Sequence, residues 1–329
     1  MIDFCVLGSG ISGSTIANLL SKKYSVEIID KANGIGGRAS NKKLNKLVSF
    51  DHGLQYFSPK SINYQKYLNG FIKKGVLKFW GGNHIDLTFE RKNNKKKIIG
   101  VKGNNDLNKY LLKKIKKTLN EEVINIKFTN NHWEIFGNKR KFKARSIIVT
   151  FPFDQTKKLV KKYLKGSFLK LKVKMTPNLT VLLSQKTKQS VPISSIKLNN
   201  SLISWISNEN SKKRFTKKES YWTIQTSEIF SKKNINLYKK KKNYYSNLIA
   251  KEFSNILNIN FKSLKIFRIH GWKYSYNKIK TNDEFYWSKK LRIGVCGDWF
   301  IGPNAESSWM SANALFNAIK KNPPKSRRV

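Results

Sequence analysis

The sequence is poor in cysteine, acidic residues and arginine. Its two cysteines, Cys5 and Cys296, lie in apolar stretches, so we expect buried thiols rather than a disulfide or a metal pair. No apolar run reaches the length of a transmembrane helix, and we expect no integral membrane segment. The motifs H-E-x-x-H, C-x-x-C and G-x-S-x-G are absent, so we expect neither a metal nor a nucleophile of those kinds.

Lysine dominates the charge of the chain. The 329 residues include 66 basic and 19 acidic side chains, a formal net charge of +47, and nine of the basic residues are arginines. Chains that bind nucleic acid usually concentrate arginine and aromatic residues in one patch, whereas lysine is spread along this whole sequence. We interpret much of the charge as compositional and expect no specific nucleic-acid partner. The charge still attracts anionic small molecules and leaves anionic membrane surfaces open as partners.

The first 38 residues carry the most specific pattern. They predict, in order, a strand over Ile2–Leu7, a glycine turn over Gly8–Gly13, a helix over Ile11–Lys22, a strand over Val26–Ile29 and the acidic residue Asp30. The turn fits G-x-G-x-x-G and stands between a strand and a helix. That context is typical of a dinucleotide-binding βαβ unit, whereas the motif alone also occurs in ordinary glycine turns.

Each residue type in this turn has a physical reason. Gly8 allows a tight turn off the strand, Gly10 lets a diphosphate approach the backbone, and Gly13 lets the helix pack on the sheet. The helix begins at Ile11 and Ser12, where free N–H groups and the positive end of the helix dipole favour a phosphate. Asp30 is placed to accept hydrogen bonds from a ribose, with Lys31 beside it.

A second glycine turn, Ile35–Arg38, follows within eight residues of Asp30. Gly36 and Gly37 allow a close backbone approach, and Arg38 offers a forked cation for a phosphate. The combination resembles the flavoprotein amine oxidase and phytoene desaturase superfamily, which binds FAD. The alternative is a plain loop with a surface salt bridge at Arg38.

The segment Phe50–Phe57, which reads F-D-H-G-L-Q-Y-F, resembles the renalase-like branch of FAD-dependent oxidoreductases. In that branch this segment passes beside the flavin ring. The resemblance implies that Gly53 permits close approach and that Gln55, Tyr56 and Phe57 line the ring or the substrate space. For Asp51 and His52 we favour a structural role in a buried strand and a capped turn.

A strand late in the chain also resembles a part of the family that lies near the flavin. Ile269–Tyr274 is similar to an H-R-W-x-Y strand, although Gly271 replaces the arginine. Trp272 and Tyr274 point to one side of this strand and, with His270, are candidates for the wall above the ring; a core role is the alternative. The catalytic candidates are therefore Gln55, Tyr56, His270, Trp272 and Tyr274.

The C-terminal part resembles the segment that closes the flavin site. A strand over Leu291–Cys296 ends in Gly297 and Asp298, whose carboxylate the resemblance places at the ribityl chain. A helix from Glu306 to Lys321 follows, and in the family its N-terminus faces the pyrimidine end of the flavin. The resemblance implies four cofactor contacts at this N-terminus. Elsewhere in the chain, it implies that the backbone of Val123 contacts the adenine. The four are Glu306, Ser307, Ser308 and Trp309.

We predict an α/β fold with a Rossmann-type FAD-binding domain of the glutathione reductase and amine oxidase kind. An interleaved α+β substrate domain is expected on a mixed, largely antiparallel sheet. The predicted FAD-binding segments are 1–57, 100–155 and 271–329, and the predicted substrate-binding segments are 58–99 and 156–270. Apolar spacing predicts helices over 106–119, with its lysines on the solvent side, and over 243–257.

The function implied is a renalase-like oxidase with non-covalent FAD. Such an enzyme takes hydride from a dihydronicotinamide-type substrate, an anionic dinucleotide, and passes electrons to molecular oxygen, giving peroxide. The alternatives are a flavin amine oxidase or desaturase, and a basic scaffold that binds nucleic acid or anionic membrane. Met1–Asp3 lacks the basic start of a signal peptide, so a cytoplasmic setting is expected.

Overall fold

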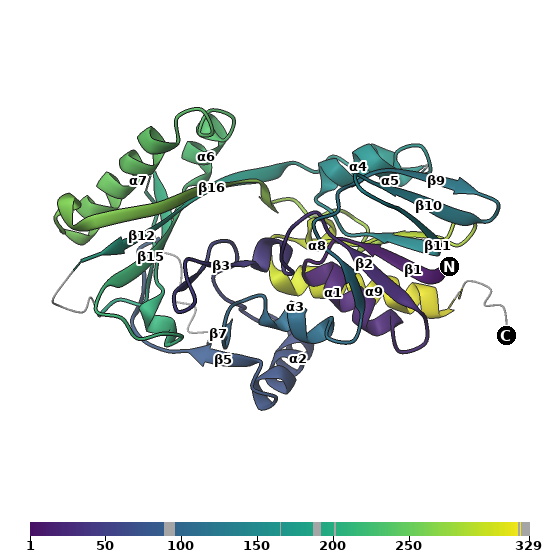
Figure 1. The fold of residues 1–329 in the computed structure, drawn as a ribbon, viewed down its shortest axis with the longest axis horizontal. Coiled ribbons are helices and arrows are strands. Elements are labelled where there is room, and N and C mark those ends of the chain that lie inside the picture. The colour runs from purple at the N-terminus through teal and green to yellow at the C-terminus, as the bar shows by residue number, and fades with distance from the viewer. Residues whose placement is uncertain (89–95, 165, 187–191, 201, 322, 324–329) are drawn as a thin grey trace. The chain divides into compact units, whose positions relative to one another are not determined.

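The computed structural model describes residues 1–88, 96–164, 166–186, 192–200, 202–321 and 323. The chain folds as two compact units, each assembled from separate segments (Figure 1). Unit 1 comprises 1–37, 107–175 and 276–329, and unit 2 comprises 38–106 and 176–275. These bounds differ from the predicted domains, because segments 38–57, 100–106 and 271–275 lie in unit 2 and segment 156–175 lies in unit 1. Most of the C-terminal segment 322–329 lies outside the described residues.

Unit 1 is built on a sheet whose parallel centre follows the order β18-β11-β1-β2-β8. The strand β17 flanks β18 antiparallel, and β9 and β10 form an antiparallel ribbon that joins β11. The strands are β1 Ile2–Leu7, β2 Val26–Ile29, β8 Lys116–Thr118, β9 Val123–Thr129, β10 His132–Gly137, β11 Lys141–Val149, β17 Tyr286–Ser288 and β18 Ile293–Val295. A parallel sheet of this kind confirms the predicted Rossmann-type α/β fold.

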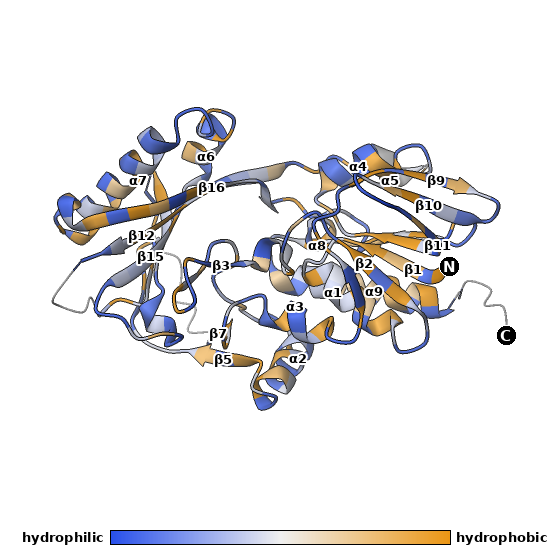
Figure 2. Ribbon diagram, viewed as in Figure 1, coloured by the Kyte–Doolittle hydropathy of each residue, from blue (hydrophilic) through white to orange (hydrophobic). Residues whose placement is uncertain are grey.

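Helices from both ends of the chain share one core in unit 1. The helix α1 Ile11–Leu20 lies beside α9 Ala305–Lys321 (Figure 1). Ile16 and Leu20 of α1 and Leu315 of α9 belong to the same buried cluster as the apolar strand β1, which is orange in Figure 2. The other helices are α3 Asp106–Leu111, which starts at the edge of unit 2, α4 Phe153–Val160, α5 Ser167–Lys170 and α8 Asp298–Ile301.

One predicted helix is wrong in its second half. The helix expected over 106–119 ends at Leu111, and Lys116–Thr118 forms the edge strand β8. This short strand pairs in parallel with β2, where Ile28 lies opposite Lys117. Residues Lys116–Thr118, which the helical spacing assigned to the predicted helix, therefore hydrogen-bond to the sheet instead. The lysines expected on the solvent side of this helix lie instead on a turn and on the edge strand β8.

Unit 2 is built on a six-stranded sheet of order β16-β12-β15-β14-β13-β6. The pairs β12–β15, β15–β14 and β14–β13 are antiparallel and β13–β6 is parallel, which confirms a mixed, largely antiparallel sheet. Its strands are β6 His84–Asp86, β12 Met175–Gln185, β13 Ser195–Lys197, β14 Ile203–Asn208, β15 Ser220–Thr226 and β16 Leu264–Asn277. The core of this sheet includes Trp222 of β15, packed with Ile249 and Phe253 of the helix α7 Lys242–Leu257.

The rest of unit 2 consists of short elements. Two two-stranded sheets pair β3 with β4 and β5 with β7. The β4 strand leads directly into the segment 52–57 that the sequence singled out. These elements are η1 Gly37–Ala39, β3 Asn41–Lys43, β4 Ser49–Asp51, α2 Ile62–Lys73, β5 Leu77–Trp80, β7 Lys97–Gly100, η2 Asn210–Lys212, α6 Glu228–Asn234 and η3 Phe261–Ser263.

Candidate functional site

The first glycine turn has the geometry of a phosphate cradle. Gly8 has φ of +104°, and a Cβ on Gly13 would lie 1.9 Å from the carbonyl oxygen of Gly8, so the turn and helix α1 pack too closely for a side chain. Gly10 differs, because a Cβ there would meet no atom of the described part of the chain within 4 Å. Gly10 is also the N-cap of α1 and provides no side-chain cap. The first N–H groups of the helix therefore remain available to an anion.

Asp30 is fixed beside this turn, at the end of β2. One oxygen of its carboxylate accepts hydrogen bonds from the backbone N–H and the hydroxyl of Ser9, at 2.7 and 2.6 Å. The other oxygen accepts the N–H of Ala32 at 2.8 Å. An ionised carboxylate has about four acceptor positions, so capacity remains for a ribose hydroxyl.

The second glycine turn packs on the first. The N–H of Gly36 donates to the carbonyl oxygen of Ser9 at 3.2 Å. Gly37 has φ of +52°, and a Cβ there would lie 3.0 Å from the Cα of Gly10. Gly36 and Gly37 are thus needed because their backbone lies against the backbone of Ser9 and Gly10 in the first turn. Asn108 on α3 supports the same turn by donating to the carbonyl of Ser9 and the hydroxyl of Ser14, a contact that the sequence did not suggest.

The C-terminal helix reaches the cradle. The hydroxyl of Ser12 donates to the carbonyl oxygen of Ser308 at 3.1 Å, across 296 residues of sequence, and both residues are buried. The hydroxyl of Ser311 accepts the N–H of Gly297 at 3.0 Å. The structure thus brings Gly10–Gly13 together with the predicted segment 297–309.

The N-terminus of α9 is partly occupied by the chain itself. The side-chain oxygen of Asn304 accepts the N–H of Ser307 at 2.8 Å, so that N–H is not free for a ligand. Glu306 is buried in the first turn of α9, and Asp298 is buried at the start of α8. Trp309 is half-buried on α9. The sequence did not single out Asn304 as a cap.

Two further predicted contacts lie at the edge near Asp30. The N–H of Glu121 donates to the carbonyl oxygen of Asp30 at 3.0 Å, which brings the start of β9 and its first residue, Val123, to the end of β2. Lys31 forms an ion pair of 3.3 Å with Glu122, and both side chains are more than half exposed. Lys31 is therefore already paired on the surface.

The segment 51–57 of unit 2 is held at almost every residue. The N–H of Leu54 donates to the carbonyl of Arg38 at 2.8 Å, and the carbonyl of Leu54 accepts the side chain of Asn104 at 2.7 Å. The carbonyl of Gly53 accepts the side chain of Gln225 at 2.7 Å. Phe57 exchanges two backbone hydrogen bonds with Ile98. These hydrogen bonds restrict the backbone conformation of the segment.

Gly53 is required by its neighbours within unit 2. A Cβ at this position would lie 2.1 Å from the carbonyl oxygen of Arg38 and 3.1 Å from the Trp272 ring. The Arg38 guanidinium donates to the carbonyl oxygen of Ser275 at 2.8 Å. These contacts explain the glycine and part of the role of the arginine without a ligand.

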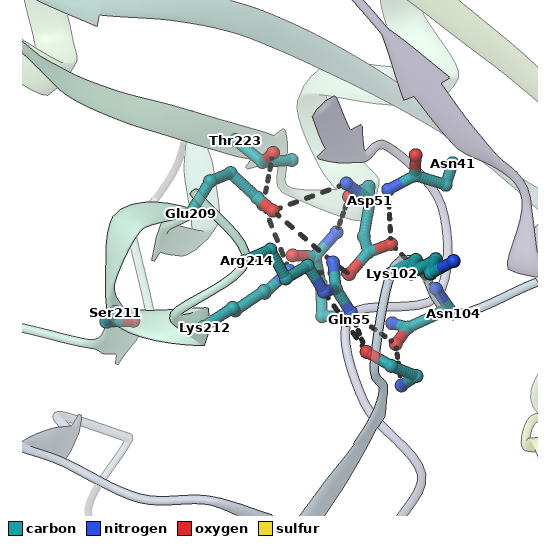
Figure 3. A network of polar contacts seen from close by, with 12 residues as sticks. Asn41, Asp51, Gln55, Lys102, Asn104, Glu209, Ser211, Lys212, Arg214 and Thr223 are labelled. Atoms are coloured by element: carbon teal, nitrogen blue, oxygen red, sulfur yellow. Dashed lines mark hydrogen bonds and ion pairs between the residues drawn. The ribbon is translucent and has the colours of Figure 1, made fainter. Parts of the chain in front are cut away.

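Asp51 stands in a buried ionic cluster that the sequence did not predict (Figure 3). Its carboxylate contacts Lys212 at 2.9 Å and Arg214 at 2.5 Å, and Glu209 contacts Lys212 at 3.0 Å. Burial alone would raise the pKa of Asp51, but Arg214 and Lys212 hold that pKa well below its ordinary value. Burial raises the pKa of Glu209, and Lys212 opposes that rise.

Two histidines and a tryptophan form a second cluster in unit 2. The His52 ring lies 5.1 Å from both the His270 and the Trp272 ring, and the indole N–H of Trp272 donates to the carbonyl of His52. Burial lowers the pKa of His52 to about 3, and the neighbouring His270 adds to the effect. Burial, with Arg268 nearby, lowers the pKa of His270 to about 4. Both imidazoles are therefore neutral at neutral pH.

Gln55 and Tyr56 lie in different surroundings. The amide nitrogen of Gln55 donates to the carbonyls of Asp51 and Gly53, and its oxygen is buried with no hydrogen-bond partner among the described residues. The Tyr56 ring lies 5.5 Å from Trp205, and burial raises its pKa. Gln55 is thus anchored in its own segment, whereas Tyr56 belongs to an aromatic group.

The strand β16 explains its departure from the family pattern. A Cβ on Gly271 would lie 2.5 Å from the Tyr238 ring, whose hydroxyl accepts the N–H of Gly271 at 3.1 Å. An arginine at this position would displace Tyr238 from the core of unit 2. On the same strand, Lys273 lies 5.7 Å above the ring of Tyr274.

Other chemistry is limited in the part of the chain that the structure describes. Cys5 and Cys296 are both buried and unpaired, as predicted, and burial raises the pKa of each thiol. Within the described ranges, no group of three His, Cys, Asp or Glu side chains could hold a metal ion. The described helices include none that is long and apolar enough to cross a membrane.

Comparison with known proteins agrees with this geometry. Residues 6–74 match the family described as NAD(P)-binding Rossmann-like domain. A protein from Exiguobacterium sp. 255-15, provisionally named protoporphyrinogen oxidase, is similar in structure with a TM-score of 0.72 at 9% identity, over 97% of this chain and 98% of its own.

Two further structures are similar over nearly the whole chain. An oxidoreductase from Methanosarcina mazei has a TM-score of 0.68 at 11% identity, over 96% of this chain and 100% of its own. Cyclohexylamine oxidase from Brevibacterium oxydans IH-35A has a TM-score of 0.66 at 10% identity, over 97% and 99%. At these identities the likeness establishes the fold: a Rossmann-like domain with mixed sheets.

Proposed function

We propose that this chain is an FAD-dependent oxidoreductase with a non-covalent cofactor. The observation that carries the proposal is the cradle of unit 1, where the uncapped start of α1, the open face of Gly10 and the carboxylate of Asp30 lie together. The similar structures include proteins named as oxidases, which supports the same class.

The residues of the cradle fit a diphosphate and a ribose. The N–H groups at the start of α1 would hold the diphosphate, because no side chain caps them and the helix dipole favours negative charge. Asp30, already oriented by Ser9, would accept a ribose hydroxyl. The Ser12–Ser308 hydrogen bond holds the end of α9 at the cradle, where a longer, flavin-bearing dinucleotide would extend.

The state of the two thiols supports a non-covalent cofactor. Both cysteines are fully buried in the core of unit 1, and burial raises each thiol pKa. A thiol attacks as the thiolate, so neither is suited to attachment. When bound, the flavin supplies the redox chemistry, accepting hydride from the substrate and passing electrons to oxygen with peroxide as product.

The substrate we propose is a dihydronicotinamide-type, anionic dinucleotide. The cations Arg268, Lys42 and Lys239 act to lower the pKa values of the neutral pair His52 and His270, whereas the Asp51 carboxylate acts to raise the pKa of His52. This positive field favours an anionic substrate over an ammonium. An amine substrate, as for the similar cyclohexylamine oxidase, or an apolar desaturase substrate is the second candidate.

The test is aerobic mixing of the purified holoenzyme with isomeric dihydronicotinamide dinucleotides and, separately, with a panel of amines. Bleaching of the flavin and formation of peroxide with a dihydronicotinamide is expected. Bleaching only with amines would reject the substrate while the flavin assignment stands. A colourless protein that binds no FAD but binds mixed-sequence nucleic acid or anionic vesicles would reject the enzyme.

A further inference from the structure

We propose that Asp51, Glu209, Lys212 and Arg214, here called the buried ionic cluster, position the segment 52–56. The effect of this positioning on the reaction rests on the proposed function. In that function, Gln55 and Tyr56 of this segment are the residues that we expect nearest the reacting groups. The cluster members are positioning residues and touch no reacting atom themselves. All four lie in unit 2.

The cluster is completely removed from water. The side chains of Asp51, Glu209 and Lys212 are 0% exposed and that of Arg214 is 2% exposed. Two carboxylates face two cations, so the charges balance inside the cluster. The Lys212 ammonium bridges Asp51 at 2.9 Å and Glu209 at 3.0 Å (Figure 3).

Neutral groups from several elements satisfy the remaining hydrogen bonds. The second oxygen of Asp51 accepts the side chain of Asn41 and the backbone N–H of Asn104, both at 3.0 Å. Glu209 accepts the hydroxyl of Thr223 at 2.7 Å. Arg214 donates two hydrogen bonds, of 3.1 and 2.8 Å, to the carbonyl oxygen of Gly100. The cluster thereby joins β3, β4, β7, β15 and the turn after β14.

Such a cluster stabilises one arrangement rather than many. Buried charges carry a large desolvation cost, which is offset only while every partner is in place. A shift of β4 by one residue would leave Asp51 unpaired and both cations short of a partner. The cluster therefore penalises alternative positions of Asp51 far more strongly than an apolar contact would.

The restraint passes directly into the segment that follows. The carbonyl of Asp51 accepts the side-chain amide of Gln55, which closes residues 51–55 into a tight turn. Asn104 contacts the Asp51 carboxylate through its backbone, the Leu54 carbonyl through its side chain, and Arg214 at 3.2 Å. One residue thus connects the cluster with the middle of the segment.

The test compares three variants with wild type, using hydrogen exchange of amides 52–57 in the apoprotein and in the FAD-loaded protein. Lys212→Met leaves two buried carboxylates facing one cation. Glu209→Gln/Lys212→Met restores the balance of charge. Lys213→Met removes the same charge from the neighbouring, exposed lysine and is the matched control.

Lys212→Met is expected to speed exchange at 52–57 by about tenfold or more, because breaking a buried pair is strongly destabilising. Exchange in β12 and α7 should stay unchanged, and Lys213→Met should match wild type. The balanced double variant should recover to within about threefold of wild type. In the FAD-loaded protein, Lys212→Met should also change the shape of the flavin absorption band, which Lys213→Met should not.

Uniform acceleration throughout unit 2, or no acceleration at 52–57, would overturn the proposal. An unchanged flavin band despite local opening would overturn its link to the cofactor. If Lys212→Met does not fold, Arg214→Lys carries the test, since it keeps the charge but loses the paired contact to Gly100, and the same local acceleration is expected. Failure of wild type to bind FAD would reject the proposed function while the exchange result still decides the positioning.

Discussion

The substitution Gly10→Ala separates cofactor binding from folding. A methyl group on Gly10 meets no protein atom within 4 Å, and Gly10 lies at φ of −68°, where alanine is unstrained. The free energy of unfolding of the apoprotein should therefore change by no more than about 1 kcal/mol, since a poorer N-cap and a stiffer unfolded chain oppose each other.

The same methyl group would occupy the space through which the diphosphate approaches. Loss of one charge-assisted hydrogen bond costs about 1.5–3 kcal/mol. FAD should then bind roughly ten- to hundredfold more weakly. Titration of the apoprotein with FAD, followed by flavin fluorescence, measures the affinity, and urea unfolding measures the stability. Gly34→Ala is the matched control, because Gly34 is also exposed to open space and lies outside the cradle. Unchanged FAD affinity in Gly10→Ala would refute the cradle.

Three further predictions concern unit 1, the histidines and β16. Gly13→Ala should lower the free energy of unfolding by several kcal/mol, because its Cβ would lie 1.9 Å from the Gly8 carbonyl oxygen. Urea unfolding measures this change, and a stability near that of wild type would contradict the close packing. Folded-state pKa values near 3 for His52 and 4 for His270 lie below the ordinary 6.5, so the unfolded state binds more protons below pH 6.5. Stability should fall as pH drops from 6.5 toward 4, by up to about 1.4 kcal/mol per pH unit for each histidine, and the variant His52→Gln/His270→Gln should show a flatter profile. Gly271→Ala should destabilise by about 1–3 kcal/mol through overpacking on Tyr238, and a second change, Tyr238→Leu, should recover part of the loss in thermal unfolding.

Local pattern was enough to predict the cradle. The strand, glycine turn, helix and acid are contiguous in sequence, and each residue type is required by backbone geometry within about 30 residues. Gly10 and Asp30 thus lie where the pattern places them.

Contacts between residues that are far apart in the chain could not be predicted from the sequence. Lys212 lies 161 residues from Asp51, and nothing in a chain with 57 lysines marks one of them as fully buried. Lys116–Thr118 forms a strand only because β2 offers a free edge, which local spacing does not reveal. The reason for Gly271 is a ring from Tyr238, 33 residues away.

The central claim is that the cradle of unit 1 holds a non-covalent flavin dinucleotide. Its most direct test is the visible absorption spectrum of the purified protein before and after acid precipitation. We predict a yellow protein that releases FAD, equimolar with the chain, into the acid supernatant. A protein that is colourless and takes up no FAD on incubation, or one whose flavin stays with the precipitate, would contradict the account.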